Sequence, residues 1–277
     1  MAEQLNLIFI PASYSELFTM WNRYPTAVPY AGGTELIRKQ GSEILALPSI
    51  ILSLEKIEEM HRISRTERYM EVGAMVKLSQ IIDLGKIVPV TLRHCLRSIG
   101  GPQLRNMATI GGNFCARDDC LDSSAVLVAL DAQCEIRNAQ STRWISASRF
   151  HSQHHRTGLK PKEILTRIKV PLDTWDYSIY KKFSEYAGQS SRVVVFLVKA
   201  QKNILSDIRI IYKNKTLWRD KRSESILIGK QLPLNYRIVA DFVESWKAYI
   251  SGIGEVDKPS RKELVNFIEV NILNFSE

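Results

Sequence analysis

The spacing of apolar residues in the first part of the chain predicts strands and helices in alternation. Short apolar runs at 5–10, 27–30 and 50–52 have the length and the boundaries of strands. Between them, a Ser-x-x-Glu capping box opens a helix over about 13–21, and Thr34 is placed to cap a helix that runs through about Gln40. The first helix is expected to bury Leu17, Phe18 and Trp21. Residues 1 to about 54 are therefore predicted to form a small β-α-β-α-β unit.

Beyond this unit the pattern changes to alternating strands with intervening helices. The strands predicted there lie at 68–76, 133–137, 143–146 and 163–170, and the helices at 79–84, 90–99 and 124–130. Ser79 is placed to cap the first of these helices. The helix at 124–130 is apolar on all sides, so we expect it to be buried under the sheet, with Asp122 or Ser123 as its cap.

A second domain is predicted after the boundary at 171–176. Three strand-like runs follow it, at 177–183, 192–199 and 204–212. Two amphipathic helices come next, one over about 236–250 and one that begins at the capping box Ser260-x-x-Glu263. Their buried faces are expected to carry Val239, Phe242, Trp246, Tyr249, Leu264, Phe267, Ile268 and Ile272. The pattern indicates an α+β protein whose last domain is a three-stranded sheet backed by helices.

Two loops carry paired glycines with polar neighbours. The first, Tyr30-Ala-Gly-Gly-Thr-Glu-Leu36, lies between a predicted strand and a predicted helix, an arrangement that suits an anion. The second lies within 99–114, where Thr109 and Asn113 bracket a glycine pair with groups that hydrogen-bond phosphate or ribityl oxygens. Glycine lacks a Cβ, so its backbone N–H can approach an anion closely. The alternative is a pair of ordinary glycine turns.

Composition and charge narrow the choice of partners. The 277 residues are 45 % apolar and 24 % charged, as in an ordinary soluble protein, and the length favours two domains over one. The net charge of +9 suits an acidic ligand or a surface that faces acidic subunits, or it has no specific cause. Nucleic acid is one candidate partner. However, the densest basic residues, at 199–222, alternate with apolar ones, as on the solvated face of a sheet, and no nucleic-acid-binding motif surrounds them.

No export or membrane signal is found in the sequence. The N-terminus lacks a basic region, and the longest wholly apolar run, 193–198, is far shorter than the ~20 residues that a membrane span requires. The protein is therefore expected in the cytoplasm.

Cysteine usage agrees with that location. Cys95, Cys115, Cys120 and Cys134 show no disulfide-scaffold spacing. Cys115-x4-Cys120 matches the first step of a plant-type iron–sulfur pattern, but position 123 is serine, so the third ligand is missing. We therefore expect these cysteines to be small apolar residues and no cluster on this chain.

The remaining reactive residues form no catalytic constellation. His151, His154 and His155 share one loop that offers no further metal ligand, so a solvated loop is expected rather than a metal site. No Ser-His-Asp set, nucleophile elbow or dinucleotide fingerprint occurs; Gly252-Ile-Gly254 lacks the third glycine. With no catalytic side chain predicted, any chemistry has to come from a cofactor.

The two glycine loops resemble those of a known family. Ala31-Gly-Gly-Thr-Glu-Leu36 and Arg105-Asn-Met-Ala-Thr-Ile-Gly-Gly-Asn113 are similar to the paired FAD-binding loops of the medium, flavin-carrying subunit of molybdenum hydroxylases, a family that includes xanthine dehydrogenase and carbon monoxide dehydrogenase. The resemblance continues through 122–131, 159–165 and 170–171 and covers nearly the whole chain. It implies a two-subdomain FAD-binding fold of the vanillyl-alcohol oxidase/PCMH type at 1–172, divided near 54, and a carbon monoxide dehydrogenase flavoprotein-like domain at 173–277.

The resemblance also implies the cofactor, FAD, and the residues that bind it. They are Ala31, Gly32, Gly33, Thr34, Glu35, Leu36, Thr109, Gly111, Gly112, Asn113, Asp122, Ile164, Leu165 and Lys182. Backbone N–H groups of the four loop glycines and Thr34 would hold the diphosphate. Some of these residues have structural readings as well. Glu35 suits the first turn of a helix, Asp122 a helix cap, Ile164 and Leu165 the core, and Lys182 an exposed strand.

The function implied is electron transfer within a larger enzyme. A molybdopterin-binding subunit would hydroxylate an aromatic heterocycle or aldehyde, a 2Fe-2S subunit would relay electrons, and FAD on this chain would pass them to NAD or another acceptor. The match weakens at 180–192, where the family's Asp-x-Ala pattern is missing, which leaves the acceptor open. Two alternatives are a self-sufficient FAD-dependent oxidoreductase of the same fold and a non-enzymatic basic nucleic-acid-binding or scaffold protein.

Overall fold

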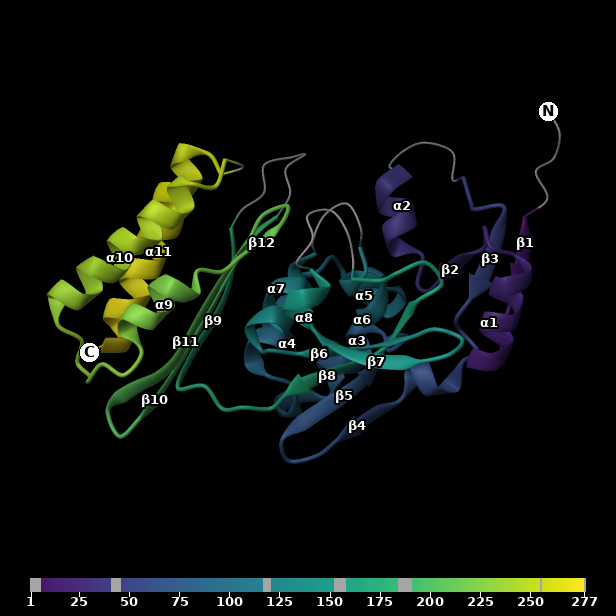
Figure 1. The fold of residues 1–277 in the computed structure, drawn as a ribbon, viewed down its shortest axis with the longest axis horizontal. Helices are drawn as coiled ribbons and strands as arrows, with labels where there is room; N and C mark the ends of the chain where they lie inside the picture. Colours follow the sequence, from purple (N-terminus) through teal and green to yellow (C-terminus); the bar gives the residue numbers. More distant parts are fainter. Residues whose placement is uncertain are drawn as a thin grey trace. The chain divides into compact units, whose positions relative to one another are not determined.

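The structure is a computed structural model that describes residues 6–40, 46–116, 121–151, 158–183, 191–254 and 256–276. The chain divides into two compact units, Met1–Leu172 and Asp173–Glu277, and each is described by itself (Figure 1). None of the described helices combines the length and the apolar content needed to cross a membrane.

The first unit opens with a small parallel sheet. Its strands are β1 (Leu7–Phe9), β2 (Val28–Tyr30) and β3 (Ile50–Ser53), in the order β1-β3-β2, with both pairings parallel. Parallel neighbours need crossover connections. Helices α1 (Tyr14–Arg23) and α2 (Thr34–Gln40) lie in those connections, which confirms the predicted β-α-β-α-β order. The side chains of α1 that are buried are the three expected, Leu17, Phe18 and Trp21.

A five-stranded antiparallel sheet forms the rest of the first unit. Its order is β4 (Ile63–Arg65), β5 (Tyr69–Gly73), β8 (Ile164–Pro171), β6 (Gln133–Arg137) and β7 (Thr142–Ser146). The hairpin of β6 and β7 was predicted from the sequence. Strand β4 was not, because all three of its residues are exposed and give no apolar signal.

Short helices connect these strands. They are η1 (Glu58–His61), α3 (Leu78–Asp83), η2 (Gly85–Ile87), α4 (Val90–Ser98), α5 (Pro102–Met107), α6 (Ile110–Phe114), α7 (Asp122–Ala129) and α8 (Ala147–Phe150). Helix α7 is buried along its whole length, as its apolar composition predicted.

Three helix starts differ from the sequence prediction. Helix α2 begins at Thr34 itself, because Gly33, at φ +69, already accepts the hydrogen bond from the N–H of Ile37. Helix α3 begins at Leu78, before the predicted cap Ser79. Helix α7 begins at Asp122, which is its first residue rather than its cap. In each case the backbone turns into the helix before the residue whose side chain suggested a cap.

The second unit is a sheet with helices packed on it. The strands β9 (Tyr177–Phe183), β10 (Arg192–Gln201), β11 (Ile204–Lys213) and β12 (Leu217–Trp218) form an antiparallel sheet in the order β12-β11-β10-β9. Helices α9 (Lys221–Leu227), α10 (Tyr236–Ser251) and α11 (Lys258–Ser276) follow (Figure 1). Buried residues of the sheet and of all three helices form one apolar core. The sheet has four strands rather than the predicted three, because β12 is too short to show a periodicity.

Helix α11 also begins earlier than predicted. Its cap is Asp257, whose Oδ1 accepts from the N–H of Ser260 at 2.9 Å, so Ser260 lies inside the helix instead of at its start. Tyr249 and Phe267, expected in the core, are only partly buried. The other six residues predicted on these two faces are buried.

Candidate functional site

The two glycine loops lie against each other in the first unit. A Cβ built on Gly32 would lie 2.0 Å from the carbonyl oxygen of Met107, and one built on Gly112 would lie 3.9 Å from the Cβ of Ala31. Contacts this close require glycine at position 32, where any side chain would displace the second loop. The structure therefore brings together the two segments that the sequence singled out.

The first loop offers backbone donors that the protein itself does not use. Within the described residues, the N–H groups of Gly32, Gly33 and Thr34 donate to no other group. Gly33 has φ +69, a conformation that glycine adopts without strain. Three successive N–H groups at a turn of this kind form a concave site for an anion.

Hydrogen bonds to other groups of the protein fix the shape of the second loop. The N–H of Gly112 donates to Oγ1 of buried Thr109 at 3.0 Å, and the N–H of Gly111 donates to the carbonyl oxygen of Ala74 at 2.9 Å. These two donors, which the sequence analysis placed on the diphosphate, are thus occupied inside the protein. Gly112 is exposed, so it contributes an open surface opposite Ala31 rather than a free N–H.

A chain of backbone contacts joins the second loop to the start of β8. Ala74, which accepts from Gly111, donates its own N–H to the carbonyl oxygen of Thr166 at 2.9 Å. Ile164 and Leu165 come immediately before Thr166, and their side chains are buried. The two residues that the resemblance placed at the isoalloxazine ring therefore lie in the strand that supports this loop.

Asp122 lies close to the same loop through its neighbour in α7. The hydroxyl of Ser123 donates to Oδ1 of Asn113 at 2.5 Å, and both residues are buried. The Asp122 side chain is 5 % exposed, so its carboxyl group is largely removed from water.

Two of the predicted residues have other surroundings. Glu35 is bound by Arg38 on its own helix, with both carboxylate oxygens 2.8 Å from guanidinium nitrogens. This agrees with its reading as a residue of the first helical turn. Lys182 belongs to the second unit, where it is half-buried and pairs with Val193 across β9 and β10.

His151 is not in the solvated loop that the sequence predicted. Its ring packs against Phe114 and Phe150, with ring centroids 4.5 and 5.1 Å apart. Burial lowers the pKa of His151 to about 4, so the imidazole is neutral near pH 7. His154 and His155 lie outside the described residues. No group of three His, Cys, Asp or Glu side chains in the described part of the chain is arranged to hold a metal ion.

The described cysteines behave as small apolar residues. Cys95 and Cys134 are buried and Cys115 is partly buried, while Cys120 lies outside the described residues. Burial raises the pKa of the Cys134 thiol, so it stays protonated.

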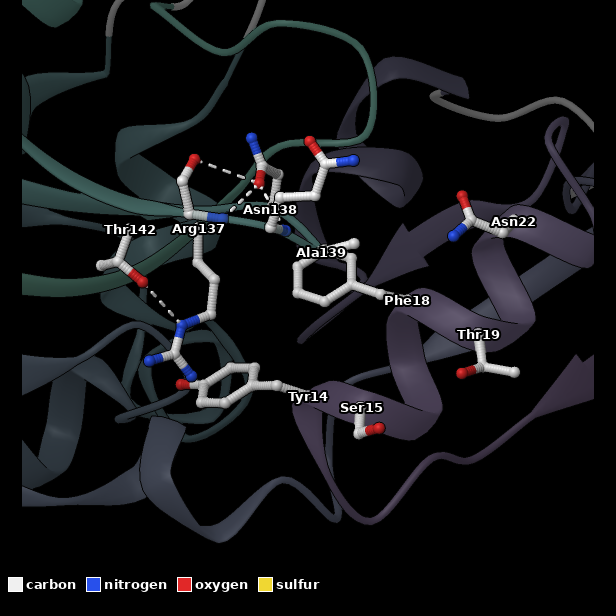
Figure 2. Close-up of a pocket in the computed structure, with 11 residues that line it drawn as sticks. Tyr14, Ser15, Phe18, Thr19, Asn22, Arg137, Asn138, Ala139 and Thr142 are labelled. Atoms are coloured by element: carbon white, nitrogen blue, oxygen red, sulfur yellow. Dashed lines mark hydrogen bonds between the residues drawn. The ribbon is translucent and has the colours of Figure 1, made fainter.

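A polar pocket of about 470 Å³ lies between α1 and the turn that joins β6 to β7 (Figure 2). At one end of α1, the guanidinium carbon of Arg137 lies 4.3 Å from the ring centre of Tyr14. Burial raises the pKa of Tyr14 to about 12. The sequence gives no sign of this pocket, because its two walls are more than 110 residues apart and neither has a motif.

Comparison with known proteins gives one family and several relatives. The family described as "FAD binding domain in molybdopterin dehydrogenase" matches residues 3–173. The glyceraldehyde dehydrogenase medium chain of Sulfolobus acidocaldarius is 29 % identical over 228 residues, which is 80 % of each chain. The carbon monoxide dehydrogenase medium chain of Afipia carboxidovorans is 27 % identical over 74 % of this chain and 73 % of that one.

Solved structures share the fold. A chain of quinoline 2-oxidoreductase from Pseudomonas putida 86 superposes with a TM-score of 0.81 at 22 % identity, and the match covers 98 % of this chain and 96 % of that one. A chain of a copper- and molybdenum-containing carbon monoxide dehydrogenase gives a TM-score of 0.79. The predicted α+β, PCMH-type FAD-binding fold is confirmed.

Proposed function

This chain belongs to the family of FAD-binding domains in molybdopterin dehydrogenases, and we propose that it collects electrons from 2Fe-2S clusters on a partner subunit and passes them to NAD or another acceptor. The resemblance found in the sequence is thus confirmed at the level of the family. The chain is an FAD-binding subunit of an oxidoreductase complex.

The observation that carries the proposed mode of binding is the contact between the two loops. Three N–H groups that donate to nothing in the described part of the chain, those of Gly32, Gly33 and Thr34, lie where the first loop meets the second. A diphosphate carries two negative charges and accepts several hydrogen bonds, so it fits such a turn. FAD, when bound, supplies the two-electron redox chemistry for which the chain has no side chains of its own.

The other predicted residues receive specific roles. Gly111 and Thr109 fix the shape of the second loop, and Gly112 leaves room for the cofactor. Asp122 and Asn113 are placed for hydrogen bonds to hydroxyl groups of FAD. Ile164 and Leu165 contribute backbone and apolar surface at the flavin ring. Ala31, Glu35 and Leu36 belong to the first loop, and Lys182, which lies in the second unit, stays a prediction drawn from the resemblance.

The names of the relatives support a multi-subunit assembly. They are medium chains or subunits of dehydrogenases and hydroxylases for glyceraldehyde, carbon monoxide and nicotine, and one is called a subunit of a dehydrogenase complex. We infer a 2Fe-2S subunit and a molybdopterin-binding subunit as the partners of this chain. Xanthine dehydrogenases also match, over a smaller share of their length, so the substrate of the assembly is not assigned.

The basic segment at 199–222 gives no support to a nucleic-acid function. Arg209 is bound by Asp207 at 2.9 Å, and Arg219 by Glu224 at 3.0 Å. Lys213 is buried and donates to Ser191. Three basic side chains of this segment are thus bound by other residues of the protein.

The test is purification of the chain and of its native assembly. The chain is expected to bind FAD in a 1:1 ratio, measured as flavin released on denaturation. The native assembly is expected to contain molybdenum and iron, and its flavin is expected to be reduced by the substrate only when the partner subunits are present. A chain that binds no FAD would overturn the proposal. Reduction of the isolated chain by an organic substrate would favour the self-sufficient enzyme.

A further inference from the structure

Lys162 combines a strained backbone with a long-range contact. Its φ is +59, which few residues other than glycine adopt. Its Nζ donates to Oδ1 of Asn22 at 2.9 Å, although the two residues are 140 positions apart. A strained backbone that the surrounding structure maintains is often linked to function. We call this contact the Lys162–Asn22 clasp.

The Lys162 side of the clasp is firmly anchored. The next residue, Glu163, is buried, and its carboxylate accepts from Arg143 at 2.7 and 3.1 Å. It also accepts from the N–H of Lys160 at 2.8 Å. These charge-assisted bonds fix the turn before β8, so the position of the Lys162 backbone is set by the sheet and not by the clasp itself.

The Asn22 side lies on a helix that is separated from the sheet by the pocket. Asn22 and Tyr14 are close to opposite ends of α1, and both line the pocket (Figure 2). Tyr14 contacts Arg137 of β6, while Asn22 contacts Lys162. The pocket lies between the middle of α1 and the β6–β7 turn, and these two contacts join the helix to the sheet near the two ends of the helix.

The distance between the helix and the sheet matters for a ligand that touches both parts. Helix α1 is followed by β2, and Gly32 and Gly33 lie just after the end of that strand. Lys162 lies two residues before Ile164, the start of β8. If FAD binds as proposed above, its diphosphate lies at the first of these segments and its flavin ring at the second. We propose that Lys162 is a positioning residue for FAD, which acts through the Lys162–Asn22 clasp by fixing the separation of the two segments; this inference rests on the proposed function.

Four variants of the full chain test the clasp. Lys162→Met removes the donor and keeps a side chain at φ +59, and Asn22→Ala removes the acceptor. Asn22→Asp keeps an acceptor for Lys162. Lys162→Gly removes the donor but relieves the backbone strain. Lys160→Met is the control, because it removes the same charge from an exposed side chain two residues away.

The readouts are the FAD dissociation rate and the thermal midpoint of the FAD-free protein. We expect Lys162→Met and Asn22→Ala each to raise the dissociation rate about fivefold, as one lost hydrogen bond would. The double variant is expected to dissociate no faster than either single variant. Asn22→Asp and Lys160→Met are expected to keep the parent rate. Lys162→Gly is expected to release FAD faster while its FAD-free midpoint is unchanged or higher, which a merely structural role would not produce.

Three results would overturn the inference, and only the last of them also overturns the proposed function. If the parent binds FAD and the Met, Ala and Gly variants release it at the parent rate, the clasp has no positioning role and the proposed function stands. The same conclusion follows if the midpoint falls in step with FAD retention in every variant. If the parent chain itself binds no FAD, the proposed function fails and the inference fails with it.

Discussion

Gly111 and Gly112, which are adjacent in the second loop, are constrained by different neighbours. Gly111 is buried, and a Cβ there would lie 2.6 Å from the Cβ and 2.7 Å from the carbonyl oxygen of Ala74. Gly112 is exposed, and its Cβ would meet Oγ1 of Thr109 at 2.9 Å and otherwise point toward Ala31. Position 111 is therefore constrained by the fold and position 112 by the space between the loops.

Replacing Gly112 with valine is expected to abolish FAD retention while leaving the protein folded. The branched side chain fills the surface opposite Ala31 and disturbs the Thr109 contact, but it meets no backbone atom of another segment. Flavin content and circular dichroism of the purified variant measure the two effects. Gly101→Val is the matched control, because Gly101 is also exposed and its Cβ would meet only the flexible end of Gln103. A Gly112→Val protein as yellow as the parent would show that the loop does not bind FAD.

Replacing Gly111 with alanine is expected to lower stability instead. The added methyl group overlaps the Ala74 backbone, and overpacking of this kind costs about 1–3 kcal/mol. Urea unfolding of the FAD-free protein measures the loss, with Gly112→Ala as the comparison. Equal stability of the two variants would mean that the contact between the second loop and Ala74 is looser than the structure shows.

At the scale of elements, Glu224 connects α9 to strand β11 in the sheet of the second unit. The residue is 2 % exposed, and its Oε1 accepts from the N–H of Ile210 at 2.8 Å and from Arg219 at 3.0 Å. Strand β12 pairs only with Tyr212 and Lys213, so Ile210 lies beyond its end and takes its acceptor from the helix. Burial raises the pKa of Glu224 to about 7 despite the attraction of Arg219.

Glu224 is expected to make the second unit less stable as pH rises from 4.5 to 7. The carboxyl group binds its proton more tightly in the folded state, so its stabilising contribution is complete below 4.5 and is lost through a folded-state pKa of about 7. The difference between the folded-state pKa of about 7 and the ordinary value of 4.5 corresponds to roughly 3 kcal/mol of unfolding free energy. Glu224→Gln keeps an acceptor for Ile210 and cannot titrate. Between pH 4.5 and 7, the difference in unfolding free energy between the parent and Glu224→Gln should therefore change by roughly 3 kcal/mol. A difference that stays constant over this pH range would contradict the expectation.

The sequence predicted most elements but not where their helices begin. Strands and helices with a clear apolar period, such as β8 and α10, were found close to their bounds. Helix starts were read from polar side chains at Thr34, Ser79 and Ser260, whereas the backbone turns earlier in each case. Strand β12 and helices α5 and α9 are too short or too exposed to give a periodic signal.

The candidate site was predictable as a pair of loops and not as a set of contacts. Glycine pairs with Thr109 and Asn113 are visible in the sequence, and the resemblance assigned them to FAD. That Ala74 occupies the donor of Gly111 could not be foreseen, because the sequence does not state which distant segment meets the loop. The contact of Thr109 with Gly112 is local, three residues apart, and was not considered because both residues were assigned to the ligand. The burial of His151 against Phe114 was missed for the same reason.

At the scale of the whole molecule, His151 and Glu224 are expected to shift the stabilities of the two units in opposite directions as the pH changes. His151 is in the first unit and has a folded-state pKa of about 4, below its ordinary value of 6.5. Its contribution to stability is therefore complete above 6.5 and is lost as pH falls toward 4, by roughly 3 kcal/mol. Glu224, in the second unit, loses its contribution as pH rises. Acid weakens one unit through His151 and strengthens the other through Glu224.

Calorimetry of the full chain is expected to resolve these responses as two transitions. Lowering the pH from 7 to 5 should lower the thermal midpoint of the first unit relative to that of the second. His151→Phe should reduce the pH response of the first unit's transition only, and Glu224→Gln that of the second unit's transition only. FAD stabilises the state that binds it, by about 2.7 kcal/mol at a hundredfold excess over the dissociation constant, so it should raise mainly the first midpoint, by roughly 5–10 °C. A single transition that FAD and pH move as a whole would show that the two units unfold together.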